Sequence, residues 1–298
     1  EQAMDFVREV GFPVIVKPLS PSHDTDRFIC NTTDELESAL DRSLSRNYIN
    51  RCSIEQSIVG YKEIEMVGVR DGAGNKILVS GLEDMDPIGI HSGDSIIFAP
   101  TQTLINEEYQ KLRTAAFKVM DAINITGSCH IQFAVNSKDS KYFVTKVSPF
   151  FTRDTLLAEK ATGYPLTYIS CFLELGYTLT EIKLPNNYSK YTPFMEPTID
   201  HVLVRIPLWP FADVPETDQH LNTMMKSVGS TIGIGRTVEE ALMKAMHSSQ
   251  FSPRDILPSA SEIDEDEIIN ELIHPLASRI LILMEALRRV YSIDELSE

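Results

Sequence analysis

The sequence predicts an α+β fold, in which helices and antiparallel hairpins are mixed along a chain of 298 residues. Two segments, 63–82 and 129–147, each contain two strand patterns joined by turn residues, which is typical of a β-hairpin. Several other segments carry apolar residues at the spacing of an amphipathic helix. No internal repeat is visible, so the mixed class is favoured over a repeat architecture.

The N-terminal part is predicted to alternate between helices and strands. The first residues are amphipathic up to Gly11, and glycine commonly ends helices. Further on, Thr32 and Glu35 form a capping-box pattern, in which the two side chains satisfy backbone N–H groups at a helix start. The elements expected here are a helix over 1–11, a strand over 12–16, a helix over 36–45 and a strand over 53–58.

The middle of the chain is predicted to contain two hairpins separated by a long helix. Residues 71–75, Asp-Gly-Ala-Gly-Asn, supply the turn of the first hairpin. In the helix, Leu112, Ala115 and Met120 fall on one face. The expected elements are strands over 63–70 and 76–82, a helix over 107–123, strands over 129–135 and 142–147, and helices over 154–161 and 166–175, the last ending at Gly176.

The C-terminal part is predicted to be looped at first and then helical. Gly229, Gly233 and Gly235 are not followed by the Lys-Ser/Thr pair of a phosphate loop, so they are interpreted as turn and packing residues. A Pro- and Ser-rich stretch over 252–261 indicates a domain boundary. The expected elements are a loop over 183–200, a strand over 202–206, a helix from Thr237 to about Met246, and helices over 262–273 and 275–290.

The composition is that of an ordinary globular protein, with 43% hydrophobic and 23% charged residues. The net charge of −16 argues against nucleic acid and anionic membranes as partners, because both would repel the chain. No apolar run approaches the roughly 18 residues of a membrane span, and no signal peptide is recognisable. The four cysteines contain no CxxC pair, which is typical of reduced thiols. A cytoplasmic protein is therefore expected.

Several blocks of sequence carry a resemblance to a known family. They span 86–95, 93–104, 130–136, 142–153, 156–165 and 226–237. In this order and spacing they resemble the large chain of carbamoyl-phosphate synthetase, in the ATP-grasp unit of its first, carboxyphosphate-forming half. Residues 262–298 are similar to the start of that family's helical oligomerisation domain. The resemblance implies a partial ATP-grasp fold, its N-terminal part absent, over 1–252, followed by a linker and a short helical segment over 253–298.

The resemblance also implies roles for individual residues. In the family, two lobes close on ATP, and Mg2+ bridges the phosphates to carboxylate and amide side chains, because Mg2+ requires hard oxygen ligands. Lys17 takes the place of a family arginine that faces the phosphates, which keeps the charge but loses the bidentate fork. Arg153 matches a second family arginine. The residues expected to bind the nucleotide or the metal are Glu63, Gly89, Ile90, His91 and Gln132, with Gln132 as the metal ligand.

The chain departs from the family pattern where metal and phosphate would bind. The family's glycine-rich run is replaced by residues 23–28, His-Asp-Thr-Asp-Arg-Phe, which contain no glycine. The family's metal-binding glutamate and asparagine become Lys146 and Ser148, and the arginine that follows becomes Phe150. A glutamate expected near the adenosine is Gln56. ATP is therefore kept as an expected ligand, whereas the lost ligands argue against Mg2+.

These departures leave three functions open. The first is a divergent family member in which ATP-driven phosphorylation of bicarbonate, a step toward carbamoyl phosphate for arginine or pyrimidine biosynthesis, is weakened or lost. In that reaction Lys17 and Arg153 would steady the phosphates. The second is a non-catalytic module, in which Lys146 replaces the metal ion, or residues 262–298 bind a synthetase partner chain or a second copy of this chain. The third is an active ligase whose missing ligands come from another chain.

Simpler interpretations of the same residues also stay open. Lys146 fits a solvated lysine on an edge strand, and His91 fits a turn histidine held by its neighbours. Glu63 and Glu65 alternate with apolar residues, so both fit the polar face of a strand.

Overall fold

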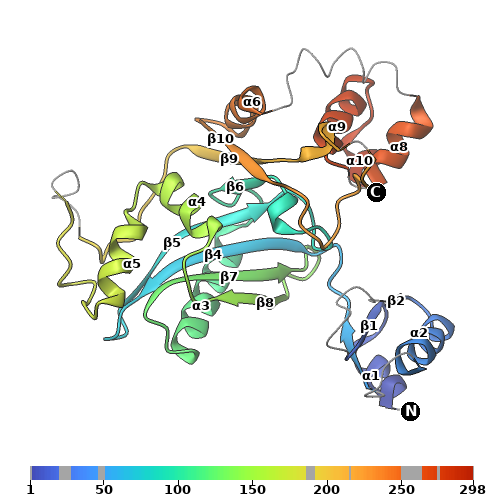
Figure 1. Ribbon diagram of the computed structural model, residues 1–298, viewed down its shortest axis with the longest axis horizontal. Coiled ribbons are helices and arrows are strands. Elements are labelled where there is room, and N and C mark those ends of the chain that lie inside the picture. Colours follow the sequence, from blue (N-terminus) through green and yellow to red (C-terminus); the bar gives the residue numbers. More distant parts are fainter. Residues whose placement is uncertain are drawn as a thin grey trace. The chain divides into compact units, whose positions relative to one another are not determined.

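The computed structural model describes residues 2–19, 28–45, 51–185, 192–214, 216–249, 264–273 and 276–297. The chain divides into two compact units, Glu1–Val59 and Gly60–Glu298, each with its own sheet (Figure 1). The predicted boundary between residues 252 and 253 falls outside the described residues and stays a prediction.

The first unit is a three-stranded antiparallel sheet packed with two helices. β1 (Val14–Pro18) lies between β2 (Phe28–Cys30) and β3 (Cys52–Gln56), and α1 (Gln2–Val10) and α2 (Thr33–Ser45) complete the unit. Val14 and Leu36 belong to its small core. The backbone N–H of Glu35 donates to Thr32 Oγ1 at 3.3 Å, and the Glu35 carboxylate accepts from the N–H of Asn31 at 2.7 Å. The predicted helix start is therefore confirmed, with the returning bond made one residue earlier than in a capping box.

The second unit is built on a seven-stranded antiparallel sheet. Its strands are β4 (Lys62–Arg70), β5 (Lys76–Asp84), β6 (Ile97–Ala99), β7 (Gly127–Val135), β8 (Tyr142–Ser148), β9 (Val202–Leu208) and β10 (Gly229–Gly235). They are ordered β10-β9-β6-β5-β4-β7-β8. Both predicted hairpins, β4–β5 and β7–β8, are confirmed, and β4 also pairs with β7, which joins the hairpins at the centre of the sheet.

Helices cover both faces of this sheet (Figure 1). The elements involved are α3 (Asn106–Ala122), α4 (Arg153–Thr162) and α5 (Leu166–Glu174). α3 packs through residues such as Leu112 against Ile64 and Met66 of β4, whereas α4 and α5 pack in one core with Val67 and Val69. Because side chains alternate along a strand, these two groups lie on opposite faces of β4. All three helices lie where the sequence predicts them, over 107–123, 154–161 and 166–175.

Strand β10 packs tightly under helix α6 (Val238–Ser248). A Cβ atom on Gly233 would lie 2.1 Å from the carbonyl oxygen of Ala241, and one on Gly235 would lie 2.5 Å from the nitrogen of Ala241. The predicted packing role of these glycines is confirmed. Their predicted place in a turn is wrong, because the segment pairs along its whole length with β9.

The described tail consists of α8 (Glu265–Ile273), α9 (Arg279–Arg288) and α10 (Ile293–Ser297). The helix predicted over 275–290 is shorter than expected and ends just before Val290, whose φ of 71° lies in the left-handed region. Ile268 and Ile282 share a small core in this segment. Within the described ranges, no helix has both the length and the apolar character needed to cross a bilayer. All four cysteines are free thiols.

Candidate functional site

A cluster of buried polar and charged side chains lies on the face of the second sheet that α4 covers. Glu63, Glu65 and Val67 are alternate residues of β4, so their side chains lie on the same face of the sheet. β7 pairs with β4 in a register that places Gln132 opposite Glu65. This polar cluster consists of Glu63, Glu65, Asp84, His130, Gln132, Asp154 and Arg205, all of which are buried.

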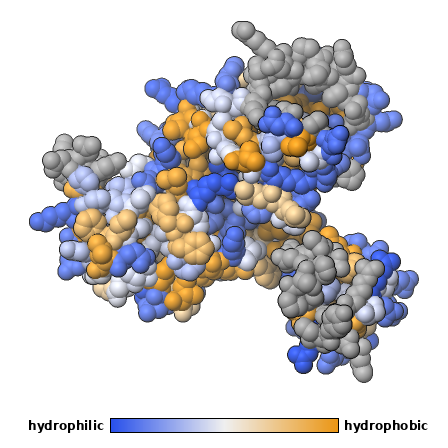
Figure 2. Space-filling view, in the orientation of Figure 1, coloured by the Kyte–Doolittle hydropathy of each residue, from blue (hydrophilic) through white to orange (hydrophobic). Residues whose placement is uncertain are grey.

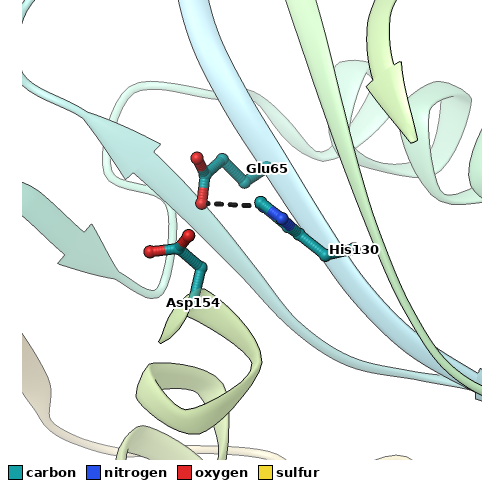
Figure 3. A group of neighbouring side chains, drawn as sticks. All are labelled: Glu65, His130 and Asp154. Atoms are coloured by element: carbon teal, nitrogen blue, oxygen red, sulfur yellow. Dashed lines mark ion pairs between the residues drawn. The ribbon is translucent and has the colours of Figure 1, made fainter. Parts of the chain in front are cut away.

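Glu65 and His130 form the centre of the polar cluster. His130 Nε2 lies 3.0 Å from Glu65 Oε2, and the two side chains are 3% and 0% exposed (Figure 3). Glu65 Oε1 accepts a hydrogen bond from Gln132 Nε2 at 2.9 Å. Burial works against the ionised form of Glu65, but His130 and Gln132 outweigh it and lower the pKa of this carboxyl. Burial also disfavours an imidazolium, yet the Glu65 carboxylate raises the pKa of His130.

Arg205 supplies the permanent positive charge of the polar cluster. It is 1% exposed, and its Nη1 donates to Asp154 Oδ1 at 2.8 Å, at the start of α4. Its Nη2 donates to the carbonyl oxygen of Ser92 at 2.8 Å, in the short 3-10 helix η1 (Ser92–Asp94). Burial, followed by the charge of Glu65, raises the pKa of Asp154. Because a buried arginine needs partners, this pair ties the start of α4 to both β9 and η1.

The polar cluster carries more acidic than basic groups. Burial, together with the charge of Glu65, raises the pKa of Glu63 to about 8. The same causes raise the pKa of Asp84 well above its usual range. Neither carboxylate oxygen of Asp84 has a hydrogen-bond partner among the described residues. The cluster therefore holds protons at neutral pH unless cations neutralise it.

The two positions that the family resemblance identifies with metal ligands lie on β8, beside the polar cluster. Lys146 stands opposite Gln132, and Ser148 stands opposite His130. Lys146 is exposed, whereas Ser148 is buried. An ammonium group has donors and no lone pair, so Lys146 offers nothing to Mg2+, which requires oxygen ligands. Lys146 therefore does not fit the Mg2+ of the family, whereas Ser148 keeps a hydroxyl oxygen.

The segment predicted to contact the nucleotide leads into η1. Gly89 has a φ of 131°, a value that side chains rarely permit. Ile90 is buried in a small core with Trp209. His91 Nδ1 accepts a hydrogen bond from the N–H of Gly93 at 2.9 Å, and burial lowers the pKa of this imidazole. The roles of these residues toward a nucleotide stay predictions.

The two predicted phosphate-binding cations lie in different units. Arg153 is the first residue of α4 and is exposed, with Nη2 3.8 Å from Met225 Sδ. Lys17 lies on β1 of the first unit and pairs with Glu55. The run predicted to replace the glycine-rich loop, 23–28, lies outside the described residues except for its last position, which begins β2.

Sequence reasoning did not assign five members of the polar cluster to a site: Glu65, Asp84, His130, Asp154 and Arg205. Two of them carry a signal in the sequence. His130 lies two residues before Gln132 and so faces the same side of a strand. Arg205 is the only charged residue in the strand Val-Leu-Val-Arg-Ile-Pro-Leu, and charged residues are rarely buried without a partner. Asp84 and Asp154 have no comparable signal, because each lies at an element's end.

The fold is similar to solved enzyme structures. A biotin carboxylase–beta-gamma-ATP complex from Campylobacter jejuni has a TM-score of 0.52, at 18% identity, over 67% of this chain and 43% of that chain. The N5-carboxyaminoimidazole ribonucleotide synthetase from Thermotoga maritima has a TM-score of 0.55, at 17% identity, over 83% of this chain and 64% of that chain. At these identities the likeness concerns the fold alone. It confirms the predicted α+β class with an ATP-grasp-type fold.

The family follows from the sequence matches. Residues 1–182 match the model of the carbamoyl-phosphate synthase L chain, ATP binding domain, and residues 230–298 match that of the carbamoyl-phosphate synthetase large chain, oligomerisation domain. The chain is 42% identical over 301 residues to the carbamoyl phosphate synthase large chain, N-terminal section, of Aquifex aeolicus (strain VF5). That match covers 100% of this chain and 54% of the relative, so the chain spans about half of the relative's length. The chain belongs to the carbamoyl-phosphate synthetase large-chain family, as predicted.

Proposed function

We propose that this chain is a divergent ATP-binding segment of a carbamoyl-phosphate synthetase large chain, in which Mg2+-dependent phosphoryl transfer is weakened or lost. The parent reaction is the ATP-driven phosphorylation of bicarbonate toward carbamoyl phosphate. The observation that carries the proposal is the position of Lys146, directly opposite Gln132 on neighbouring strands.

The charge at position 146 determines whether a metal ion is favoured there. A family glutamate replaced by lysine changes the local charge by two units. At about 4 Å, repulsion between such a group and a cation is on the order of a few kcal/mol at intermediate dielectric. Exposure of Lys146 to solvent and salt reduces this repulsion but leaves its sign. An ammonium in this place favours phosphate oxygens over a metal ion.

A metal-free mode of nucleotide binding therefore fits the retained residues. Lys146 and Arg153 would supply positive charge to the phosphates, and Gly89, Ile90 and His91 would line the base and ribose. Gln132 is occupied by hydrogen bonds from its amide nitrogen to Glu65 and to Ser92 Oγ, at 2.9 and 3.2 Å. It would act here as a positioning residue.

Isothermal titration of the full chain with ATP, with and without Mg2+, tests the proposal. We expect ATP to bind and Mg2+ to leave the affinity unchanged. The Lys146→Glu variant should lose about tenfold in metal-free affinity. Lys138→Glu is the matched control, because it reverses an exposed charge in the turn of the same β7–β8 hairpin.

Two results would contradict the proposal. Binding that Mg2+ strengthens, together with ATP hydrolysis stimulated by bicarbonate, would identify an active ligase whose missing ligands come from elsewhere. Equal losses in Lys146→Glu and Lys138→Glu would show that position 146 has no special role.

A second candidate function is a non-catalytic scaffold that associates through its C-terminal helices. Residues 230–298 match an oligomerisation domain. Ile273, Val290 and Ile293 are apolar side chains that are 67%, 86% and 78% exposed. Hydrophobic residues also interrupt the hydrophilic surface on the face that Figure 2 shows. We expect sedimentation to show a dimer or larger assembly that deletion of residues 262–298 dissociates; a monomeric full chain would exclude self-association.

A further inference from the structure

Three side chains of the polar cluster form a compact set of metal-type donors. Glu65 comes from β4, His130 from β7 and Asp154 from the first turn of α4, and the three point toward one another (Figure 3). One donor atom from each lies within 4.8 Å of the other two, and all three residues are buried. Because two strands and a helix start fix these positions, little ordering is left for a ligand to impose.

Glu65 and Asp154 each accept a hydrogen bond from a neighbouring side chain through one carboxylate oxygen. Gln132 Nε2 donates to Glu65 Oε1 at 2.9 Å, and Arg205 Nη1 donates to Asp154 Oδ1 at 2.8 Å. Glu65 Oε2 and His130 Nε2 are both fully buried. They lie 3.0 Å apart as an ion pair, and neither has a hydrogen-bond partner beyond the other among the described residues. Outer hydrogen bonds that leave the inner atoms available are the usual surroundings of metal ligands.

The charge balance also favours a cation. The cluster contains four carboxyl groups, those of Glu63, Glu65, Asp84 and Asp154, whereas its permanent positive charge is that of Arg205 alone. A divalent ion would offset two carboxylate charges. Leaving buried charge uncompensated is strongly destabilising, so the cluster must otherwise bind protons.

We propose that Glu65, His130 and Asp154 bind one divalent transition-metal ion of the Zn2+ class. Imidazole and carboxylate are ordinary ligands of such ions, and three protein ligands leave a coordination position for water or a small ligand. The imidazole distinguishes this site from one for Mg2+, which takes oxygen ligands. The proposed ligands do not include Lys146 or Ser148, the positions on which the function proposed above rests.

Titration of the chelator-treated full chain with Co2+, followed by visible absorption, tests the proposal. We expect one equivalent of Co2+ to give d–d bands, Zn2+ to abolish them and Mg2+ to leave them unchanged. His130→Gln should weaken binding by at least about tenfold. His247→Asn is the matched control, because it removes an exposed histidine on α6, and it should leave binding unchanged.

Glu65→Gln and Asp154→Asn provide further variants of nearly unchanged volume if His130→Gln does not fold. The unsubstituted chain also gives a readout of its own, because an ion that binds only the folded state raises the melting temperature. Absence of Co2+ bands and of any Zn2+-dependent rise would overturn the proposal and leave His130 and Glu65 as an ion pair only. Equal weakening in His130→Gln and His247→Asn would assign the binding to surface histidines and overturn it as well.

Discussion

Replacing Gly233 by alanine is predicted to destabilise the second unit by about 3 kcal/mol, at the upper end of ordinary overpacking costs. The new methyl group would lie 2.1 Å from the carbonyl oxygen of Ala241 and 2.5 Å from the backbone nitrogen of Ala245. Non-bonded carbon atoms pack at roughly 3.5–4.0 Å. Because both obstacles are helix backbone, no side-chain rotation relieves them, and α6 must move away from β10.

Urea unfolding followed by the fluorescence of Trp209 measures this cost. Trp209 is the only tryptophan of the chain and lies buried in the second unit, next to the end of β9. A loss of about 3 kcal/mol corresponds to a fall in melting temperature of roughly 6–12 °C for a unit of this size.

Gly229→Ala is the matched control on the same strand. The nearest atom to its new Cβ is Leu208 Cδ1, at an ordinary 3.9 Å. Both substitutions lower the entropy of the unfolded chain alike, so the difference between them isolates the contact with α6. A Gly233→Ala variant within about 0.5 kcal/mol of Gly229→Ala would refute the packing argument.

Three further predictions concern buried charges, and unfolding measurements test each of them. Arg205→Met should cost about 3–5 kcal/mol, because it leaves Asp154 without its partner, and Arg205→Met combined with Asp154→Leu should recover most of the loss; equal stability of the two variants would contradict this. Asp71→Ala should cost about 2–3 kcal/mol, because the Asp71 carboxylate accepts hydrogen bonds from two backbone N–H groups and one side-chain amide at 2.8–2.9 Å, whereas no loss would mean that water replaces it. The pKa of Glu63 is raised to about 8 in the folded chain, so its contribution to the free energy of unfolding is complete below its unfolded pKa and is lost as pH rises through the folded pKa. Glu63→Gln should make the free energy of unfolding fall less over this pH range. The same fall in the variant and the parent chain would contradict the prediction.

The sequence predicts the elements whose signals are local. The helix α3 and the hairpins β4–β5 and β7–β8 appear where periodicity and turn residues place them. β6 is missed because three residues show no period. β10 is missed because its alternating glycines, which α6 requires for close approach, carry no β-propensity of their own. The pairing of β6 with both β5 and β9 is not predicted either, since it joins segments far apart in the chain.

The candidate site divides in the same way. Gln132 was expected to hold metal and Glu63 to hold the nucleotide, and the β4–β7 pairing brings both into the polar cluster. Arg205 reaches the cluster from a strand that follows a long loop, so no local pattern connects it to Asp154. The burial of Glu65 is also a tertiary effect, because period-two alternation fits a solvated strand face equally well.

Restoring the family's glutamate at position 146 is predicted to destabilise the chain rather than repair it. Burial raises the pKa of Glu63, and the positive charge of Lys146 is among the groups that oppose this rise. Lys146→Glu would remove that opposition and add a fifth carboxylate beside the polar cluster. The variant should therefore lose more stability relative to the parent chain at pH 8 than at pH 5, and Glu63→Gln in the same background should remove most of the difference. Urea unfolding in the presence of a chelator measures this effect, and a loss equal at both pH values would show that Lys146 does not influence the cluster. The predicted coupling means that the charge of Lys146 helps to stabilise the buried carboxyl groups of the polar cluster. Restoring the family's metal ligands therefore requires changes on both β8, at Lys146, and β4, at Glu63.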